Sequence, residues 1–494
     1  MTAGQAVCHE RNRAGRALAR LKPSAHPRLG IAGLAAAAAA CSALAMAPVL
    51  ASAAATSVGS PVRAASSSPT AADWPAYLDG PLHASYSAGQ KVITPTTASS
   101  MKQEWEFSVG AVFDASPTVA DGAVFIGAEN GWFYKLNAHT GGVIHKVFLG
   151  TQPDLACGAK GITATATVAV NPASKVLTVY VAGGDGYLYA LRASNLHREW
   201  RSVIGIPSMK VNDYYDWSSP TIAHGVIYTG ISSNCDKPLI RGGVLAFAER
   251  TGKKLGHFFT VPRGAENAGG SVWSSVGVAP DGDVYATTGN GPDSKPQLQN
   301  SESIIKLSAT RLKLLGSFKV PKSQVTSDGD FGGSPVFFGK YVGACNKNGV
   351  FYALRQASMK LAWWKRIATA SGTGECLATP AYNGTDLFFG GGQATIDGTQ
   401  YGGSVQERLA TTGKLVWSTG LSGIVLGSPT LDGGGVLTAG TYRGSDAGVF
   451  LINAATGDVI TELDTGMAFG QAVFAHNWLF TASGDGVAAW GGAG

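Results

Sequence analysis

Short runs of apolar residues alternate with polar turn residues along the chain from about residue 70 onward. Residues 124–126 and 132–134 are two such runs, rich in β-branched and aromatic side chains, and the Ala-Glu-Asn-Gly of 128–131 separates them. Runs of this length, bounded by Gly, Asn and Asp, predict β-strands joined by hairpin turns. Helical periodicity is nearly absent after residue 70, so the pattern predicts an all-β protein.

The strand pattern repeats with a period of roughly 40–50 residues. Ser-Pro-Thr opens three repeats, Ser-Pro opens another, and a Thr-Gly turn follows in several of them. Each repeat predicts about four antiparallel strands, or one propeller blade, because such a sheet buries its faces by stacking against its neighbours. We count eight copies, with seven or nine as the alternatives: 116–147, 165–203, 218–261, 273–320, 333–367, 379–419, 428–463 and 468–490.

The two ends of this array complement each other. The last copy lacks an outer strand, and residues 104–109 form an unclaimed strand ahead of the first copy. Pairing these two segments would close the ring and remove its exposed sheet edges. The sequence therefore predicts an eight-bladed β-propeller of four-stranded antiparallel blades, with the N-terminal strand closing the ring.

The first 72 residues differ in composition from the repeats. A basic flank at 11–28 precedes an Ala-rich apolar stretch at 29–50, and small residues at 51–53 offer a cleavage site. That order predicts a secretory signal over 1–55, a linker over 56–72 and a propeller over 73–494, in a secreted or cell-envelope protein with no stable membrane span after cleavage. A retained membrane anchor and lipid attachment at Cys41 are the alternatives.

The net charge of the chain comes from this N-terminal segment. Residues 1–66 hold 7 of the 38 Lys and Arg residues but only 1 of the 32 Asp and Glu residues, which leaves 31 of each sign in the remainder. A neutral mature domain gives no electrostatic reason to bind nucleic acid, so we expect no nucleic-acid partner.

Four cysteines remain once the N-terminal segment is set aside. An even number in an exported chain suggests two disulfides, and we predict the adjacent-blade pairs Cys157–Cys235 and Cys345–Cys376. No two cysteines have the two-residue spacing of a zinc site or a haem c attachment site. The sequence thus contains no haem-attachment motif.

One turn pattern points to a particular kind of propeller. Residues 410–417 read Ala-x-Thr-Gly-x-x-x-Trp, and Trp200 and Trp364 end less complete copies at the same position. This pattern resembles the tryptophan-docking repeat of quinoprotein dehydrogenases and of the outer-membrane assembly propellers, and residues 73–87 resemble the lead-in of that superfamily. The resemblance covers nearly all of 73–490 and implies the fold more strongly than any activity, because many relatives bind no cofactor.

Three local matches resemble the enzyme branch in the same order and at similar separations. The segment from Trp273 to Asn290 resembles the stretch in which a Trp lies under pyrroloquinoline quinone and an Asn binds calcium. Residues 328–333 resemble the stretch that supplies the catalytic base, either Asp330 or Asp328, with the following Phe favouring Asp330. The Asn-Lys-Asn-Gly turn resembles the one whose lysine, here Lys347, hydrogen-bonds the quinone oxygens.

These residue types suit quinone chemistry. An indole offers a planar ring the largest aromatic face, and a calcium ion held by amide and carboxylate oxygens polarises the reactive carbonyl. A nearby carboxylate takes the alcohol proton, and a fixed ammonium stabilises charge that develops on the quinone oxygens. The alternative for each residue is structural: a Trp that fills the centre of the ring, an Asn or Asp in a turn, and a solvated lysine at a hairpin tip.

The sequence also departs from the enzyme pattern. The adjacent-cysteine pair of many alcohol dehydrogenases is missing, since Cys157 stands alone, and Lys160 lies near the place of an expected Arg. No glutamate calcium ligand is evident, and Asn234 or Asp236 lies near its place. Because the chain has no haem-attachment motif, electrons taken from a substrate would pass to a separate carrier.

Two functions follow from the sequence. The first is an exported oxidoreductase that oxidises a small-molecule or polymeric alcohol, or a related hydroxyl compound, with pyrroloquinoline quinone and calcium. The second is a cofactor-free propeller that binds protein or carbohydrate. A Ser-His-Asp hydrolase has little support, because no Gly-x-Ser-x-Gly elbow is present and the nine histidines are scattered. Convergence of Trp273, Asn290, Asp330 and Lys347 would favour the first.

Overall fold

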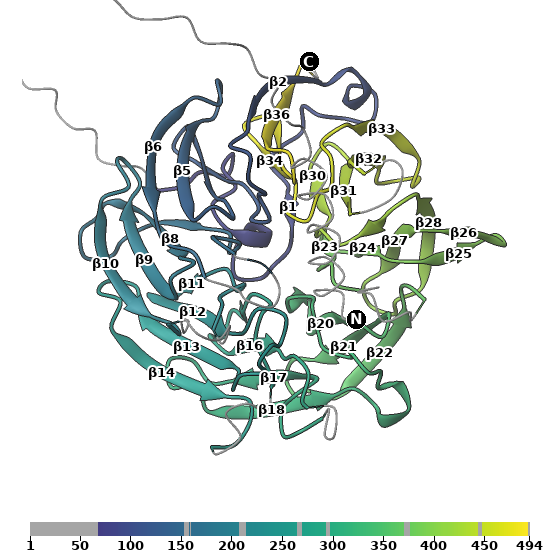
Figure 1. The fold of residues 1–494 in the computed structure, drawn as a ribbon. Coiled ribbons are helices and arrows are strands. Elements are labelled where there is room, and N and C mark those ends of the chain that lie inside the picture. Colours follow the sequence, from purple (N-terminus) through teal and green to yellow (C-terminus); the bar gives the residue numbers. More distant parts are fainter. Residues whose placement is uncertain are drawn as a thin grey trace, which may run out of the picture. The chain divides into compact units, whose positions relative to one another are not determined.

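The computed structural model describes residues 68–152, 158, 160–206, 214–263, 269–292, 297–369, 376–442 and 447–492. The predicted signal segment, most of the predicted linker, and Cys157 lie outside these residues. The described residues form eight blades around a common axis, each built on four antiparallel strands and one of them extended by two short strands, which confirms the predicted eight-bladed propeller (Figure 1).

Each blade runs outward from a short inner strand to an outer strand. Blades 1 to 4 consist of β3 (Thr118–Ala120), β4 (Ala123–Gly127), β5 (Trp132–Asn137) and β6 (Val143–Phe148); β7 (Thr167–Val170), β8 (Leu177–Ala182), β9 (Tyr187–Arg192) and β10 (Arg198–Val203); β11 (Thr221–Ala223), β12 (Val226–Ile231), β13 (Gly243–Ala248) and β14 (Lys254–Phe259); and β15 (Gly277–Val278), β16 (Val284–Thr287), β17 (Ser303–Leu307) and β18 (Leu314–Lys319).

The remaining blades follow the same plan with small additions. Blades 5 to 8 consist of β19 (Val336–Phe338), β20 (Tyr341–Asn346), β21 (Val350–Arg355) and β22 (Leu361–Arg366); β23 (Ala381–Tyr382), β24 (Asp386–Gly391), β27 (Gly403–Leu409) and β28 (Leu415–Leu421), with the hairpin of β25 (Ala394–Ile396) and β26 (Thr399–Tyr401); β30 (Thr430–Asp432), β31 (Val436–Tyr442), β32 (Val449–Asn453) and β33 (Val459–Leu463), joined by β1 (Tyr86–Ser87) and β29 (Ile424–Val425); and β34 (Val473–Ala475), β35 (Trp478–Ala482) and β36 (Val487–Gly491) with β2 (Lys102–Phe107).

The ring closes as the sequence predicted. Strand β2, from the N-terminal side of the array, pairs antiparallel with β36 and supplies the outer strand of blade 8. The described residues contain no α-helix, only the 3-10 turns η1 (Tyr77–Asp79), η2 (Ala98–Ser100) and η3 (Lys322–Gln324).

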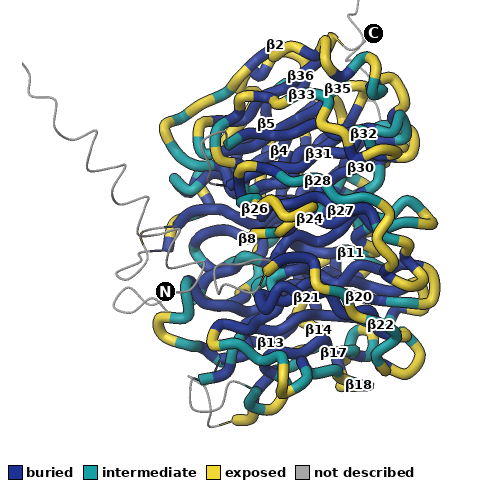
Figure 2. The backbone as a smooth tube through the Cα atoms, turned by 90° about the vertical axis from the view of Figure 1, so that its right-hand side faces the viewer, coloured by how far each residue is buried: buried dark blue, intermediate teal, exposed yellow. Residues whose placement is uncertain are grey.

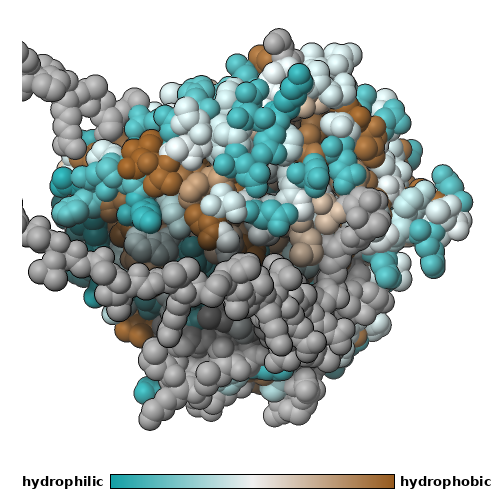
Figure 3. Space-filling view, turned by 45° about the horizontal axis from the view of Figure 1, so that its top comes forward, coloured by the Kyte–Doolittle hydropathy of each residue, from teal (hydrophilic) through white to brown (hydrophobic). Residues whose placement is uncertain are grey.

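The core lies between neighbouring blades. The second and third strands of the blades are largely buried, whereas an outer strand such as β6 is mostly exposed, and the turns lie at the surface (Figure 2). Phe125 and Phe133 of blade 1, for example, belong to one cluster with Val179 and Leu191 of blade 2. Figure 3 shows hydrophobic side chains on one face in separate groups among hydrophilic ones.

Tryptophans of the outer strands dock onto the Thr-Gly turn of the next blade. Trp105 Nε1 donates to the carbonyl oxygen of Ala138 (3.0 Å), and Trp417 Nε1 donates to that of Ala454 (3.0 Å). A Cβ on Gly457, the glycine of the turn, would lie 2.6 Å from the Trp417 ring. Glycine is therefore required there by close approach as well as by its positive φ.

One predicted docking residue is wrong by one position. Trp363, not Trp364, packs against the turn glycine Gly413, where a Cβ would lie 2.8 Å from the indole, and Trp364 is 45% exposed. Trp363 lies four residues after the turn residue Met359, as Trp417 lies four residues after Gly413, so position 363 is the equivalent one in the outer strand. The other docking residue expected from the sequence, Trp200, does pack against its turn glycine.

The repeated Ser-Pro-Thr has a structural purpose that the sequence did not reveal. The backbone N–H of the first residue in one blade donates to the side-chain hydroxyl at the same position in the next blade. We call these positions the hydroxyl belt. The seven belt hydrogen bonds are Ser116 to Thr165, Thr165 to Ser219, Ser219 to Ser275, Ser275 to Ser334, Ser334 to Thr379, Thr379 to Ser428, and Gln471 to Ser116, at 2.8–3.0 Å.

The segment before β2 crosses one end of the axis and bonds to the inner strands. Backbone carbonyls of Pro75, Pro81 and Ala84 accept from Val168, Val278 and Tyr382, in three different blades. His83 Nδ1 donates to the carbonyl oxygen of Pro335 (2.7 Å). This segment, residues 72–87, therefore ties blades together that are distant in the sequence, and we call it the plug.

The cysteine pairing agrees with the prediction where it is described. Cys345 and Cys376 form a disulfide between blades 5 and 6. Cys235 is also disulfide-bonded, while Cys157, its predicted partner, lies outside the described residues.

Candidate functional site

A buried charge cluster lies at the axis end of blade 5. Lys347, in the turn between β20 and β21, places its Nζ 2.7 Å from Asp330 Oδ1 and 3.1 Å from Asp328 Oδ1. Lys347 is 7% exposed, Asp330 3% and Asp328 5%. Charges this far from water are retained only when they are paired, so the cluster is built around these contacts.

Blade 4 contributes two more predicted residues to the same cluster. Trp273 Nε1 donates to Asp330 Oδ2 (2.8 Å), and the Lys347 ammonium lies 5.5 Å from the centre of the indole ring. Asn290 Nδ2 donates to Asp328 Oδ1 (2.7 Å). The buried Oδ1 of Asn290 has no hydrogen-bond partner among the described residues, which is unusual for a buried polar atom.

Local hydrogen bonds explain why Lys347 points inward. The side chain of Asn346 donates to Gly329 O (2.5 Å), and the Lys347 N–H donates to Asp330 O (3.0 Å), so the turn is fastened to the acidic loop. Asn346 Oδ1 in turn accepts from the N–H of Asn348 (2.9 Å), which shapes the hairpin tip. The Asn-Lys-Asn-Gly turn is therefore not a solvated tip but one wall of the cluster.

Asp236 approaches the cluster from blade 3. Its Oδ1 accepts from the hydroxyls of Ser233 (3.2 Å) and Ser271 (3.4 Å), and the Ser271 carbonyl accepts from Gly289, next to Asn290. Asn234, the other predicted ligand, is buried in the same loop, where its carbonyl accepts from the N–H of Lys237 (3.4 Å). Asp236 is thus the member of this pair whose side chain reaches Ser271.

Burial dominates the electrostatics of the cluster. Desolvation raises the pKa of Asp330 to about 7, although the Lys347 ammonium opposes this shift, and desolvation also raises the pKa of Asp236. The pKa of Lys347 is raised, because its carboxylate neighbours outweigh its own desolvation. Three carboxyl groups face one ammonium, so the site has a surplus of acid that either protons or a cation would balance.

Lys160, the third residue predicted to bind the cofactor, belongs to another charged cluster. Lys160 is ion-paired with Glu129 and lies 3.7 Å from Asp114 Oδ2, between blades 1 and 2. Its ammonium lies 5.6 Å from the centre of the Trp217 ring. Lys160 and Lys347 therefore have different carboxylate partners, and each ammonium lies over a different tryptophan ring.

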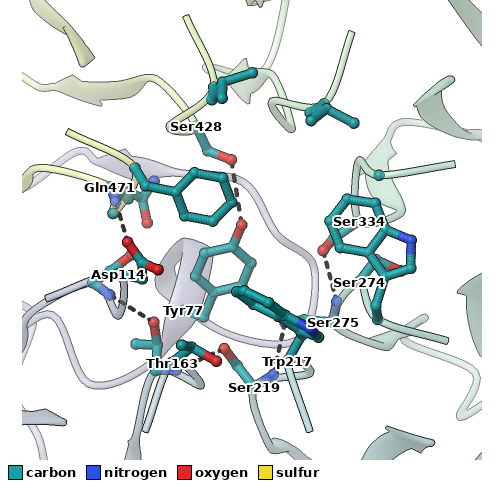
Figure 4. Close-up of a pocket in the computed structure, with 18 residues that line it drawn as sticks. Tyr77, Asp114, Thr163, Trp217, Ser219, Ser274, Ser275, Ser334, Ser428 and Gln471 are labelled. Carbon is teal, nitrogen blue, oxygen red and sulfur yellow. Dashed lines mark hydrogen bonds between the residues drawn. The ribbon is translucent and has the colours of Figure 1, made fainter. Parts of the chain in front are cut away.

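Both tryptophans line one cavity of about 80 Å³ on the axis (Figure 4). Its lining follows the pseudo-symmetry: the residue two positions before each belt position faces the axis. These eight residues, which we call the floor layer, are Asp114, Thr163, Trp217, Trp273, Gly332, Leu377, Leu426 and Phe469. Tyr77 of the plug closes the cavity from the other side, with its hydroxyl 3.4 Å from Ser428 Oγ (Figure 4).

Gly332 makes room for this layer. A Cβ at position 332 would lie 2.1 Å from Leu377 and 2.7 Å from the Trp273 ring. The missing side chain allows the Trp273 indole and Leu377 to meet across blade 5. Trp217, Leu377, Leu426 and Phe469 were not predicted as site residues, although their constant spacing from the belt positions in each repeat was a signal for them.

The described residues contain no group of three or more His, Cys, Asp or Glu side chains arranged to hold a metal ion. A cation at the cluster would therefore rely on amide oxygen as well as carboxylate. Asn290 Oδ1 is such an amide oxygen, and no described residue donates a hydrogen bond to it.

Comparison with known proteins agrees with this architecture. A family profile described as outer membrane protein assembly factor BamB matches residues 59–230. A search of curated proteins found no significant match. Among solved structures, the quinohemoprotein alcohol dehydrogenase of Comamonas testosteroni is 16% identical, with a TM-score of 0.66, covering 85% of this chain and 80% of its own.

Two further structures show the breadth of the fold. A europium-containing methanol dehydrogenase is 14% identical, with a TM-score of 0.68, covering 85% of this chain and 91% of its own. BamB from Moraxella catarrhalis is 14% identical, with a TM-score of 0.52, covering 79% and 98%. Taken with the eight blades and the docking tryptophans, these likenesses identify the chain as a PQQ-like repeat β-propeller, similar in fold to quinoprotein alcohol dehydrogenases and to BamB.

Proposed function

We propose that this protein is an exported quinoprotein-like oxidoreductase that oxidises an alcohol or related hydroxyl compound with pyrroloquinoline quinone and calcium. The observation that carries the proposal is the convergence of Trp273, Asn290, Asp330 and Lys347 in one buried network, although they come from separate segments of two blades. The network combines an indole, an amide, a carboxylate and an ammonium, which are the four groups that the proposed chemistry needs.

The residues fit a planar, anionic quinone. Trp217, Trp273 and Phe469 present aromatic surface at one level of the axis, and a flat conjugated ring stacks on such a surface. Lys347 and Lys160, each above one of the tryptophans, offer ammonium groups to quinone and carboxylate oxygens. When bound, the quinone supplies an acceptor for the hydride of the alcohol carbon.

A calcium ion fits the charge and the donor type of the cluster. The surplus of carboxyl groups over ammonium attracts a divalent cation, and Asn290 Oδ1 and the Asp236 carboxylate are hard oxygen donors. Since the described side chains include no set of three acidic ligands, we expect the ion to need oxygen atoms of the quinone as well. Calcium affinity should therefore depend on the quinone.

The chain's own residues divide the remaining work. In this proposal Asp330 accepts the hydroxyl proton of the substrate, and its raised pKa brings it near the pH at which a general base works well. The Trp273 N–H holds one carboxylate oxygen of Asp330 in a fixed direction. The Lys347 ammonium stabilises negative charge beside the indole face, and the plug excludes water from the far end of the axis.

One structural observation supports an exported protein. The Cys345–Cys376 disulfide indicates an oxidising compartment. In the described part of the chain, no helix is long and apolar enough to cross a membrane. Since no haem-attachment motif is present, we expect a separate protein or small molecule to take the electrons.

The test is a titration of the purified protein with pyrroloquinoline quinone, followed by absorbance, with and without calcium. We expect saturable binding that calcium tightens, and reduction of an artificial dye when alcohols are added. Lys347→Met should weaken binding. Lys306→Met is the matched control, because Lys306 also pairs with an aspartate and lies 5.5 Å from an aromatic ring centre, that of Tyr285, but far from the axis. Absence of quinone binding would remove this proposal.

A cofactor-free binding scaffold is the second candidate. The match of the BamB profile to residues 59–230 favours it, and Lys347 already has its charge satisfied without a ligand. A protein that binds no quinone, yet retains an intact fold, would support this alternative.

A further inference from the structure

One disulfide cross-links the chain beside the charge cluster to the chain beside the floor layer. Cys345 lies near the end of β20, two residues before Lys347, and Cys376 comes directly before Leu377 of the floor layer. Both half-cystines are buried, and their Cα atoms lie 5.1 Å apart. Because a disulfide fixes the separation of the two residues that it joins, it restrains the neighbours of both.

Leu377 fills the place of a side chain that blade 5 lacks. A Cβ at Gly332 would lie 2.1 Å from Leu377 and 2.7 Å from the Trp273 ring. Leu377 and Trp273 also belong to one hydrophobic cluster, together with Phe469. The floor layer thus has no side chain of its own at blade 5, and Leu377 from the next blade completes it. Trp273, whose Nε1 donates to Asp330, packs against this leucine.

Other blades hold the residue before the floor layer by a backbone hydrogen bond. At five blade junctions its N–H donates to a carbonyl at or next to the end of the second strand of the preceding blade: Phe113 to Ser483 (3.1 Å), Ile162 to Ala128 (3.0 Å), Val272 to Ile231 (2.9 Å), Phe331 to Thr288 (3.3 Å) and Ala468 to Thr441 (3.0 Å). Among the described residues, the N–H of Cys376 makes no such bond to blade 5. The disulfide to Cys345 takes the place that a hydrogen bond has at those junctions.

The cross-linked pair also contacts the loop that carries the proposed base. A Cβ at Gly333 would lie 3.0 Å from Cys345 N and 3.1 Å from Cys345 Cβ, and the Gly333 N–H donates to Cys345 O (3.4 Å). Gly332 and Gly333 follow Asp330 closely in the chain, so one glycine gives room to Leu377 and the other to Cys345. The disulfide therefore adjoins both the floor layer and one wall of the charge cluster.

We propose that Cys345 and Cys376 are positioning residues of the site. Their disulfide holds Leu377 in the floor layer, and Leu377 in turn supports the Trp273 ring on which the quinone stacks. The last step rests on the proposed function, whereas the first concerns the folded protein alone. Without the disulfide, Leu377 would leave the gap at Gly332, and the axial cavity that Leu377 and Trp273 both line would widen at this point.

The first arm of the test needs no quinone. A double variant with Cys345→Ala and Cys376→Ala removes the cross-link and leaves no unpaired thiol from the pair, and urea denaturation shows whether it is folded. Hydrogen exchange followed by mass spectrometry should show the amides of residues 377–379 exchanging at least about tenfold faster than in the wild type, while those of 163–165, in blade 2, change little. Unchanged exchange at 377–379 would overturn the proposal, because the floor layer would then hold without the disulfide.

The second arm is the absorbance titration with pyrroloquinoline quinone. The double variant should bind the quinone at least about tenfold more weakly than the wild type, because a loosened floor must be ordered again on binding. Trp363→Ala is the matched control: Trp363 joins the same two blades through Gly413, but in the outer strand, so the variant should be less stable and yet bind quinone as the wild type does. An unchanged affinity of the double variant, or equal losses in both variants, would overturn the proposal.

Leu377→Ala tests whether the disulfide acts through this leucine. It should weaken quinone binding in the wild type but add little in the double variant, because both changes remove the same support from Trp273. Additive losses would overturn the route through Leu377. If the wild type binds no quinone, the proposed function fails, and the exchange rates at 377–379 alone then decide whether the disulfide positions the floor layer.

Discussion

The indole nitrogen of Trp273 donates a hydrogen bond of 2.8 Å to Asp330, although 57 residues separate them in the chain. The bond joins the start of blade 4 to the start of blade 5. An acceptor carboxylate held by an indole, beside a buried ammonium, is both oriented and partly desolvated, and these are the two properties that a general base needs.

Replacing this carboxylate should separate chemistry from binding. Asp330→Asn keeps an oxygen that accepts from Trp273 but cannot take a proton. We expect quinone binding to change little and dye reduction to fall by about 10²–10⁴-fold. Loss of folding in this variant, measured by circular dichroism, would instead assign Asp330 to the structural turn.

Removing the ammonium at the centre of the cluster should destabilise the fold. Lys347→Met leaves Asp328 and Asp330 buried without their cation, which costs about 3–5 kcal/mol in unfolding free energy. Adding Asp328→Asn to that variant should recover part of the loss, since one of the unpaired charges is then removed. Urea denaturation of both variants measures this. The Lys306→Met control, at a more exposed pair, should cost at most about 1 kcal/mol.

Two neighbouring tryptophans should differ sharply in their contribution to stability. Trp363 packs against the turn at Gly413, so Trp363→Ala should lower the free energy of unfolding by about 3 kcal/mol. Trp364 is exposed, so Trp364→Ala should lower it by no more than about 0.5 kcal/mol. Chemical denaturation of the two variants measures this difference. Equal losses would mean that docking at this blade does not depend on the indole.

Acid should loosen the plug through His83. Burial lowers the pKa of His83 to about 4, against about 6.5 in an unfolded chain. Between these two pKa values the unfolded chain binds a proton at His83 that the native protein does not. The contribution of the neutral, buried His83 to the free energy of unfolding is therefore complete above about pH 6.5. It is lost as the pH falls towards 4, by up to about 3 kcal/mol.

The matched variant for this effect is His83→Asn. Asn tolerates the positive φ of this position and can still donate to Pro335 O, but it does not titrate. Unfolding free energies measured at about pH 7 and about pH 4.5 should fall less between the two conditions in the variant than in the wild type. An equal fall in both proteins would assign the acid sensitivity to other groups.

The repeating pattern of the sequence was sufficient to predict the blades, their number and the closure of the ring by β2, because strand alternation and turn residues are local properties that recur eight times. The family resemblance singled out Trp273, Asn290, Asp328, Asp330 and Lys347, which the structure brings into one cluster, while their roles stay predictions. Local pattern failed where the turn lacks Thr-Gly, as before Trp363, because the docking position could not be counted from the turn, and where a residue matters only through a distant neighbour.

Only the tertiary structure decided which side chains meet at the axis. The ring brings the segments before blades 4 and 5 together, and it gives Lys347 and Lys160 different carboxylate partners. The order of motifs along a chain carries no distances between them. Those distances follow from the radial stacking of the blades, in which burial between neighbouring sheets fixes how closely each inner strand approaches the axis.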